Sequence, residues 1–346
     1  MKPELRMYGG TAAPTITPCI HFCWIGPRLP WVYAFAVLSA ARNGGIADVV
    51  LHHVDALEDD AVTRAIATEP GVRLQRLEPN RLLVNAAAVL GIGSELQACY
   101  ERLTQPAAKA DLLRAAILYL DGGIYLDLDT VTVASLQPLL GPEPFVGSEY
   151  IVWPAAVRRS RAPLRWLRAL TLDLVRKALR RAPAGWRWFR HVERWYFSGV
   201  NNAVMGAPPA SPLFAAYLRQ IAAMPAETQR IPYAIGPDLL QGLVDDGGHR
   251  CRIEPPTVFY PLPPEISEHW FRPRRRVARV TATSAATRVV HWYASVRTKG
   301  RIAGISPASI HAQRERQLYS ALVHDHVRPL PDEAVDFMAE VKKRAR

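Results

Sequence analysis

Short apolar segments alternate with segments of helical composition in the N-terminal part of the chain, and this alternation constrains the fold more than any other feature. Residues 17–24 (TPCIHFCW), 47–53 (ADVVLHH) and 72–77 (VRLQRL) have the length and composition of strands. Residues 30–42 and 58–68 lie between them and are of helical character. Strands that alternate with helices form a mainly parallel sheet, so the sequence predicts an α/β fold.

The same pattern continues into the stretch YLDGGIYLDLDTV, residues 119–131. Apolar residues recur at helical spacing over residues 106–120, and Gly122 and Gly123 are suited to end that helix. Residues 124–127 (IYLD) then read as a short buried strand with Asp127 and Asp129 at its carboxyl end. Ligands of open α/β sheets bind at such strand ends, so we expect a site there.

Composition bounds the class of protein. The 346 residues are 49% hydrophobic and 21% charged, as in soluble globular proteins, and no clean linker divides them. We therefore expect one elaborated domain over residues 1–346. The four cysteines form no zinc spacing and are expected to be free thiols, and the first residues lack an apolar stretch typical of a signal peptide. These features predict a cytoplasmic location.

Positive charge is concentrated in one segment, residues 158–195. Between Arg158 and Arg194 there are twelve Arg or Lys and two acids, a net charge of +10, interleaved with tryptophans. At helical spacing, mostly apolar residues fall on one face: Leu164, Leu167, Leu170 or Thr171, Leu174 and Ala178. Basic residues lie largely on the opposite face: Arg165, Arg168, Arg176, Lys177 and Arg180. This pattern suits a helix lying in an anionic membrane interface; the alternative is a solvated helix packed on the core. No nucleic-acid-binding module is present, so we expect no nucleic-acid partner.

Asp127 and Asp129 form a D-x-D pair that suits a hard divalent cation such as Mn²⁺ or Mg²⁺. The apolar strand before them limits their solvation, so their mutual repulsion favours a bound cation. Asp111 and Arg114, at i and i+3, share one face of the helix just upstream. Two alternatives remain open at this point: a solvated strand end without chemistry, and a phosphatase.

The phosphatase hypothesis rests on the segment DLDTV, residues 127–131, which also matches the D-x-D-x-T/V motif of haloacid-dehalogenase-type phosphatases. In that family the first aspartate attacks phosphorus and the second acts as acid and base. Asp245 and Asp246 could serve as the family's late acidic pair, but LLQGLVDDGG has the pattern of a helix end rather than of a strand. The motif also belongs near the start of its domain, whereas several strand and helix segments precede it here.

A stronger resemblance covers a longer block. KADLLRAAILYLDGGIYLDLDTV, residues 109–131, closely resembles the A-D-x-x-R…L-x-x-x-G-G-x-Y-x-D-x-D signature of family 32 glycosyltransferases. These are sugar-transfer domains related to the yeast initiation-of-mannan-chain enzyme and, more distantly, to the large clostridial toxins. Further segments resemble family motifs in the same order: IHFCWIGPRLP (20–30), FSGVNNAVMGAPPASPLF (197–214), IGP (235–237) and VVHWYASV (289–296).

The resemblance implies a GT-A-like, Rossmann-type fold with a mainly parallel sheet, flanking helices and a helical insertion. Residues 15–135 would form the nucleotide-sugar-binding half and 196–305 the acceptor-side half, with residues 158–195 as the insertion and 306–346 as C-terminal helices. The implied activity is a metal-dependent, retaining transfer of a hexose from a UDP- or GDP-sugar. The acceptor would be a glycan or glycolipid, of polysaccharide or lipopolysaccharide type, and the enzyme would lie at the inner face of the membrane if that acceptor is lipid-linked. A non-catalytic, glycan-binding relic is the alternative outside enzymes.

The resemblance also implies roles for individual residues. Asp129 would ligate Mn²⁺ (or Mg²⁺), Asp127 would contact the ribose and the metal shell, and His291 or Ser295 would complete that shell. The catalytic set bound to the donor sugar would be Asp111, Arg114 and Asn202, with Asn202 favoured over Asn201 by register. Trp24 would stack on the nucleobase and Tyr125 would lie at the donor site or be packed. Val296 stands where the family has a tryptophan, so that part of the site departs from the pattern.

Overall fold

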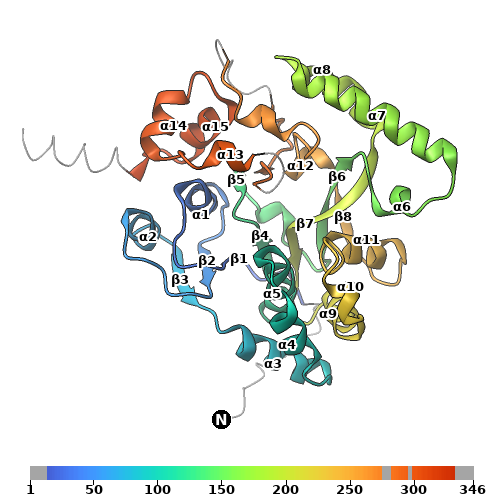
Figure 1. The fold of residues 1–346 in the computed structure, drawn as a ribbon. Coiled ribbons are helices and arrows are strands. Elements are labelled where there is room, and N and C mark those ends of the chain that lie inside the picture. Colours follow the sequence, from blue (N-terminus) through green and yellow to red (C-terminus); the bar gives the residue numbers. More distant parts are fainter. Residues whose placement is uncertain (1–13, 275–281, 295–297, 332–346) are drawn as a thin grey trace, which may run out of the picture.

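The computed structural model describes residues 14–274, 282–294 and 298–331, and within them a mixed seven-stranded sheet forms the centre (Figure 1). The strand order is β3-β2-β1-β4-β7-β6-β8, and a separate two-stranded sheet pairs β5 with β9. Their bounds are β1 Cys19–Trp24, β2 Asp48–His53, β3 Val72–Arg76, β4 Gly123–Leu126, β5 Thr130–Thr132, β6 Phe145–Ile151, β7 Phe197–Ala207, β8 Arg252–Glu254 and β9 Val289–His291. The strands β3, β2, β1 and β4 run parallel, and β7 runs antiparallel to β4 and β6. The predicted α/β fold with a mainly parallel sheet is confirmed.

Helices connect and cover these strands. In the N-terminal part they are α1 Trp31–Asn43, α2 Ala61–Ala67, α3 Pro79–Leu90, α4 Glu95–Arg102 and α5 Pro106–Asp121. The later ones are α6 Ala155–Arg158, α7 Pro163–Arg181, α8 Gly185–Val192, α9 Pro212–Ala223, α10 Ala226–Gln229, α11 Pro237–Asp245, α12 Pro256–Phe259, α13 Lys299–Ile302, α14 Pro307–Gln313 and α15 Leu318–His326. Short 3₁₀ turns occupy Gln137–Leu139, Glu193–Trp195 and Ser267–Trp270. Each strand and helix expected up to residue 127 is present, with ends within about three residues of the expected ones.

The side chains of β4 alternate between two cores, and this alternation determines where Asp127 lies. Ile124 and Leu126 pack in the core beneath α1 and α2, whereas Tyr125 packs in the core formed with α3, α5, α9 and α11. Because successive strand residues point to opposite faces, Asp127 follows Tyr125 toward the α5 side. The strand therefore brings Asp127 to the helix that carries Asp111 and Arg114.

Gly122 and Gly123 make the turn between α5 and β4 possible. Both have positive φ, +68° and +98°, a conformation that side chains rarely tolerate. A Cβ on Gly123 would lie 2.8 Å from the carbonyl oxygen of Cys19 and from the ring of His21, and one on Gly122 would lie 2.7 Å from Pro209. The glycine pair therefore ends the helix and also lets β4 approach β1 closely.

The small sheet brings the C-terminal part of the chain to the D-x-D turn. Strand β5 begins one residue after Asp129 and pairs antiparallel with β9, so that Thr130 lies opposite His291. The backbone N–H of Trp292 donates to the carbonyl of Asp129 over 2.9 Å. This pairing joins residues more than 160 positions apart in the sequence, and Trp292 is buried against side chains of α15 and α1.

The basic segment forms helices α6, α7 and α8, and the orientation of α7 differs from that of a helix packed on the core through its leucines. Arg176, expected on the solvated face, is 6% exposed and is ion-paired with Asp173 and Glu265. The leucines do not pack on the core but are exposed, with Leu164 at 78% and Leu174 at 66%. The helix therefore packs through its ion-paired side and presents its leucines outward. Among the described residues, the structure contains no helix with the length and apolarity needed to cross a membrane.

A buried histidine pair should make the fold sensitive to acid. Nδ1 of His21 lies 3.0 Å from Nε2 of His52 across β1 and β2, and burial lowers the pKa of His21 to about 4 and that of His52 to about 3. In the unfolded chain these histidines have a pKa of about 6.5, so unfolding takes up protons below that pH. The free energy of unfolding therefore falls as the pH drops from about 6.5 towards 3.

We expect the His52→Gln variant to lose less stability than the wild type between pH 7 and pH 4.5, by about 2 to 3 kcal/mol. Urea denaturation at several pH values measures the difference. His191→Gln, a change at an exposed histidine, is the matched control and should follow the wild type. Parallel pH profiles for the wild type and His52→Gln would contradict the assignment.

Candidate active site

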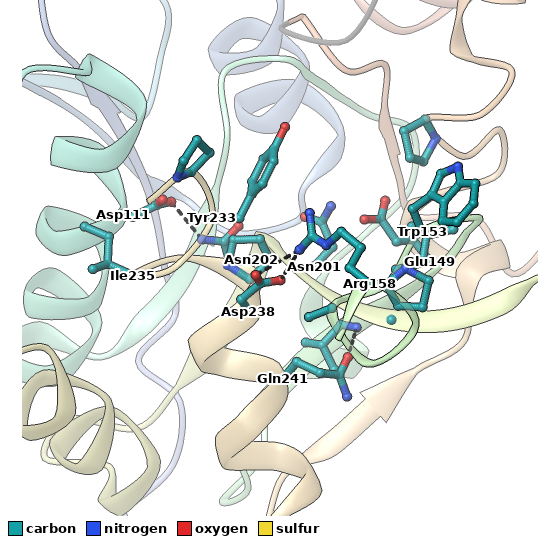
Figure 2. Close-up of a pocket in the computed structure, with 18 of the residues that line it drawn as sticks. Asp111, Glu149, Trp153, Arg158, Asn201, Asn202, Tyr233, Ile235, Asp238 and Gln241 are labelled. Atoms are coloured by element: carbon teal, nitrogen blue, oxygen red, sulfur yellow. Dashed lines mark hydrogen bonds and ion pairs between the residues drawn. The ribbon is translucent and has the colours of Figure 1, made fainter. Parts of the chain in front are cut away.

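A cavity of about 1780 Å³ opens at the carboxyl end of β4 (Figure 2). Most of the residues that the sequence nominated line it, namely Asp111, Arg114, Asp127, Asp129, Asn202 and His291. They come from four separate parts of the chain: α5, the turn after β4, β7 and β9. The fold thus brings together, at one wall of the cavity, residues that lie up to 180 positions apart in the sequence.

Arg114 is the centre of that wall, and its side chain is only 5% exposed. The guanidinium binds both carboxylate oxygens of Asp127, at 3.1 Å from Nη1 and 2.9 Å from Nη2. It also donates to the backbone carbonyl of Asn202 over 2.6 Å and lies 3.3 Å from the carboxylate of Asp111. Tyr125 lies beneath it, with the guanidinium carbon 4.9 Å from the ring centre. The planar fork of arginine satisfies these contacts together, which the single ammonium of lysine does not.

Asp127, Asp129 and His291 form the candidate metal cluster. Each offers one ligand atom, and these atoms lie within 4.8 Å of one another. Asp129 accepts from the backbone N–H of Ala294 over 2.7 Å, and its other oxygen lies 2.9 Å from Nε2 of His291. The second ring nitrogen, Nδ1, is buried and without a hydrogen bond. Two carboxylates and an imidazole are a donor set that Mn²⁺ and Mg²⁺ accept, and the free lone pairs leave positions for further oxygen ligands.

The electrostatics of the cluster show that the two carboxylates are not equivalent. Burial, with the neighbouring charge of Asp129, raises the pKa of Asp127 to about 6 in spite of Arg114. Burial also acts on Asp129, but the interaction with His291 and the hydrogen bond from Ala294 outweigh it, and the pKa of Asp129 is lowered. The crowding of like charges around Asp127 is what a bound cation would relieve.

Asn202, which the register of the family motif favoured over Asn201, lies beside Asp111 of α5. Its side-chain amide donates to Asp111 over 2.8 Å (Figure 2). The oxygen of Asn201 instead accepts from the backbone N–H of Ala203 and from the hydroxyl of Tyr260, so it is held by the protein. Asp111 and Asn202 therefore face the cavity as a hydrogen-bonded pair that offers both donors and acceptors.

Three nominated residues lie elsewhere. Tyr125 is 1% exposed and belongs to the core, so it contacts Arg114 rather than the cavity. Trp24 lies at the carboxyl end of β1, on the same sheet edge as Asp127, and packs against Tyr33 with ring centres 5.2 Å apart; it is not among the cavity-lining residues. Ser295, and Val296 with it, lie outside the described residues.

The sequence reasoning missed Glu149, a carboxylate on β6 that lines the cavity (Figure 2). It is 8% exposed, accepts a 2.5 Å hydrogen bond from the hydroxyl of Tyr293, and burial raises its pKa. An acid that ends the run FVGSE is a signal that could have found it, because acids are disfavoured inside buried strands.

The far part of the cavity, away from Asp127, is lined by the basic segment. Arg158 of α6 binds Asp238 of α11 over 3.0 Å, and Trp153 lies beside it (Figure 2). Leu164 and Arg168 of α7 line the same cavity. The cavity therefore extends from the aspartate cluster to the helical insertion, which leaves room for a second substrate beside the first.

A family model matches residues 61–146 of this chain, that of the glycosyltransferase sugar-binding region containing the DXD motif. The matched segment includes Asp111, Arg114, Asp127 and Asp129. No curated protein sequence matches the chain.

Several solved structures are similar to it at low identity. PaToxG glycosyltransferase is 15% identical over 68% of this chain and 71% of its own, with a TM-score of 0.45. Mouse xyloside xylosyltransferase 1 is 14% identical over 79% and 96%, with a TM-score of 0.42. The bifunctional glycosyltransferase WbbM is 14% identical over 92% of this chain and 51% of its own, with a TM-score of 0.42.

The matched family segment contains four of the six residues of this wall. The D-x-D pair lines a large cavity, and the helix of the same segment supplies the arginine that binds Asp127. Residues 61–146 are therefore a glycosyltransferase sugar-binding region containing the DXD motif, and the chain that carries them is a glycosyltransferase.

Proposed function

We propose that this glycosyltransferase uses a divalent cation, Mn²⁺ or Mg²⁺, to transfer a hexose from a nucleotide-sugar donor to a glycan or glycolipid acceptor. The observation that carries the proposal is the convergence of Asp127, Asp129 and His291 within 4.8 Å beside the Asp111–Arg114–Asn202 set. Cation ligands and sugar-binding groups side by side match the two parts of a nucleotide sugar, its diphosphate and its hexose.

The metal would be held by Asp127 and Asp129, with His291 as third ligand or as the group that orients Asp129. The unpaired Nδ1 of His291 and the raised pKa of Asp127 both support a cation between these side chains. When bound, such a cation stabilises the diphosphate leaving group as a Lewis acid. The assignment of Ser295 as a further ligand remains part of the proposal.

The donor sugar would be bound by the Asp111–Asn202 pair, with Arg114 behind it. Hydroxyl groups of a hexose both donate and accept, and the pair offers an acidic oxygen and an amide within 2.8 Å of each other. Arg114 favours the charged form of both aspartates and orients them, since it binds Asp127 in a fork and contacts Asp111. Trp24 remains a proposed nucleobase contact at the neighbouring strand end.

Retention of anomeric configuration is also proposed. It comes from the family resemblance, and in the structure Asp111 and Asp127 both contact Arg114, so the proposal assigns them to binding and not to nucleophilic attack. The incoming acceptor hydroxyl would then attack on the face that the diphosphate leaves. Glu149, which also lines the cavity, would accept a hydrogen bond from a substrate hydroxyl.

The phosphatase alternative receives less support from the site. The guanidinium of Arg114 contacts both oxygens of Asp127 and withdraws electron density from them, which does not favour their use as a nucleophile. Asp245, the first residue of the late acidic pair, is the last residue of helix α11 and accepts a hydrogen bond from Gln241. The strand that a phosphatase needs to present that pair is a helix here.

Hydrolysis of nucleotide sugars tests the proposal. We expect the protein to hydrolyse at least one member of a panel of UDP- and GDP-hexoses slowly in the presence of Mn²⁺, and to stop when the metal is chelated. Release of the nucleoside diphosphate measures the reaction, and a simple phosphomonoester is the parallel substrate. Phosphomonoester hydrolysis that Asp127→Asn abolishes, without turnover of any nucleotide sugar, would establish the phosphatase instead. Absence of both activities together with absence of nucleotide binding would favour the glycan-binding relic.

A further inference from the structure

Helix α7 has an exposed apolar stripe on the side opposite its packing contacts. The stripe consists of Leu164, Leu167, Leu170 and Leu174, whose side chains are 50 to 78% exposed. The buried side of the helix carries Ala169, Leu172, Asp173 and Arg176. At 3.6 residues per turn the two sets lie on opposite faces, so the leucines point away from the protein.

Burial of apolar side chains in the core does not explain this orientation of α7. Asp173 binds Arg176 and Lys177, and Arg176 also binds Glu265, so an ion-paired network faces inward where leucines were expected. Of the large apolar side chains that are exposed among the described residues, more than half belong to residues 164–195, including Trp188 at 63%. An outward stripe of this kind indicates an interaction surface.

The charges around the stripe select the kind of partner. Exposed basic side chains flank it on both sides: Arg165 and Arg168 on one, Lys177 and Arg181 on the other. Asp173 pairs with Lys177 as well as with Arg176, and Glu193 pairs with Arg190, whereas among the described residues no acid pairs with Arg165, Arg168 or Arg181. A second copy of the chain would set one segment of net charge +10 against another, which like-charge repulsion opposes. An anionic lipid surface matches both the leucines and the charge.

The stripe is also continuous with the cavity. Helix α7 lies along the edge of the molecule (Figure 1). Leu164 of the stripe lines the cavity, and the neighbouring Arg165 and Arg168 line it too. A bilayer that covers the stripe would therefore lie at the mouth of the cavity that leads to Asp127 and Asp129. A sugar anchored to a lipid could enter there while its lipid part stays in the membrane.

We propose that the α7 stripe docks in the interface of an anionic bilayer, with its leucines among the acyl chains and its flanking basic groups at the headgroups, and that the acceptor is a lipid-linked glycan. This inference deepens the proposed function and rests on it for the nature of the acceptor, not for the binding to lipid. The docking is reversible and electrostatic in part, because a single helix stripe inserts only to the depth of the interface.

Vesicle flotation tests the docking directly. The wild type should bind vesicles of phosphatidylcholine with about one third phosphatidylglycerol, and bind pure phosphatidylcholine at least about tenfold more weakly. Leu167→Ser with Leu174→Ser should lower binding to the anionic vesicles about tenfold or more, since two exposed side chains lose their insertion. Lys177→Gln with Arg181→Gln should lower it by a similar factor, about fivefold for each charge.

Matched controls separate the stripe from general surface changes. Val84→Ser with Val89→Ser alters two exposed apolar residues of α3, and Arg64→Gln with Arg250→Gln removes two exposed charges elsewhere; both should bind vesicles as the wild type does. Donor hydrolysis in the absence of vesicles is measured in the same samples and should be unchanged in all four variants. Failure of the wild type to bind anionic vesicles would overturn the docking while leaving the hydrolysis result, and thus the proposed function, intact. A dimer in light scattering that Leu167→Ser with Leu174→Ser dissociates would overturn it in favour of a second copy of the chain.

Discussion

Replacing Asp129 by Asn should lower metal-dependent turnover of the nucleotide sugar by about a thousandfold, because a cation that stabilises the leaving diphosphate contributes several kcal/mol to the transition state. The amide is nearly the same size, and its oxygen can still accept the hydrogen bond from Ala294. It has no charge to offer a cation, however, and it offers one acceptor oxygen where the carboxylate offers two. Initial rates over a series of Mn²⁺ concentrations measure the effect, and the metal concentration needed for half-maximal rate should rise with the loss of rate.

Two controls give this result a single interpretation. Asp59→Asn removes the same charge from a carboxylate that is 86% exposed and pairs with Arg64, so it should change the rate by less than twofold. Calorimetric binding of the nucleoside diphosphate with and without Mn²⁺ separates lost metal binding from a damaged fold. If Asp129→Asn keeps the metal-dependent rate of the wild type, the cluster of Asp127, Asp129 and His291 is not the cation site.

Most of the helices and strands before residue 131 could be predicted from the sequence because their signals are local, although helices α3 and α4 were not among those predicted. Each apolar segment has the length of a strand, and the glycine pair that ends α5 is required by positive φ at both positions. Asp111 and Arg114 could be placed on one helix face for the same reason. Local periodicity is enough when an element and its neighbours in the sheet are also neighbours in the sequence.

Contacts between distant segments could not be predicted in that way. His291 reaches Asp129 only through the pairing of β5 with β9, and Asn202 reaches Asp111 only because β7 inserts between β4 and β6. The family resemblance, not the residue pattern, nominated both. No family motif pointed to Glu149, because its position at the cavity depends on how β6 lies against that cavity.

The position of Arg176 on a solvated face of α7 was predicted wrongly for a physical reason. Helical periodicity identifies two faces but does not say which of them is buried. Arg176 faces inward because Asp173 and Glu265 provide it with buried partners, and a partner on a distant segment is invisible to a periodicity argument. The leucine face was identified correctly as a set, but only the structure shows that it is exposed.

Arg114→Met should lower the free energy of unfolding by about 3 to 5 kcal/mol, which is the cost of leaving buried charges without their partner. Asp127 would lose both of its hydrogen bonds from the guanidinium, Asp111 would lose its ion pair, and the carbonyl of Asn202 would lose its donor. We also expect donor turnover to fall by at least about a hundredfold, since both aspartates of the wall lose their orientation. Urea denaturation gives the first quantity, and rates measured at a temperature where the variant remains folded give the second.

Arg176→Met is the matched control, because it also removes a buried arginine that binds two acids, Asp173 and Glu265, neither of which belongs to the proposed metal or donor-sugar groups. It should cost a similar free energy of unfolding and leave the turnover of the folded protein unchanged. Arg114→Lys keeps the charge but places one ammonium where a planar fork binds two oxygens, so it should recover part of the stability and little of the turnover. If Arg114→Met and Arg176→Met lose stability and turnover in equal proportion, Arg114 acts only through the fold. If stability falls alike but turnover falls only with Arg114, the ion-paired wall orients the groups that bind the donor.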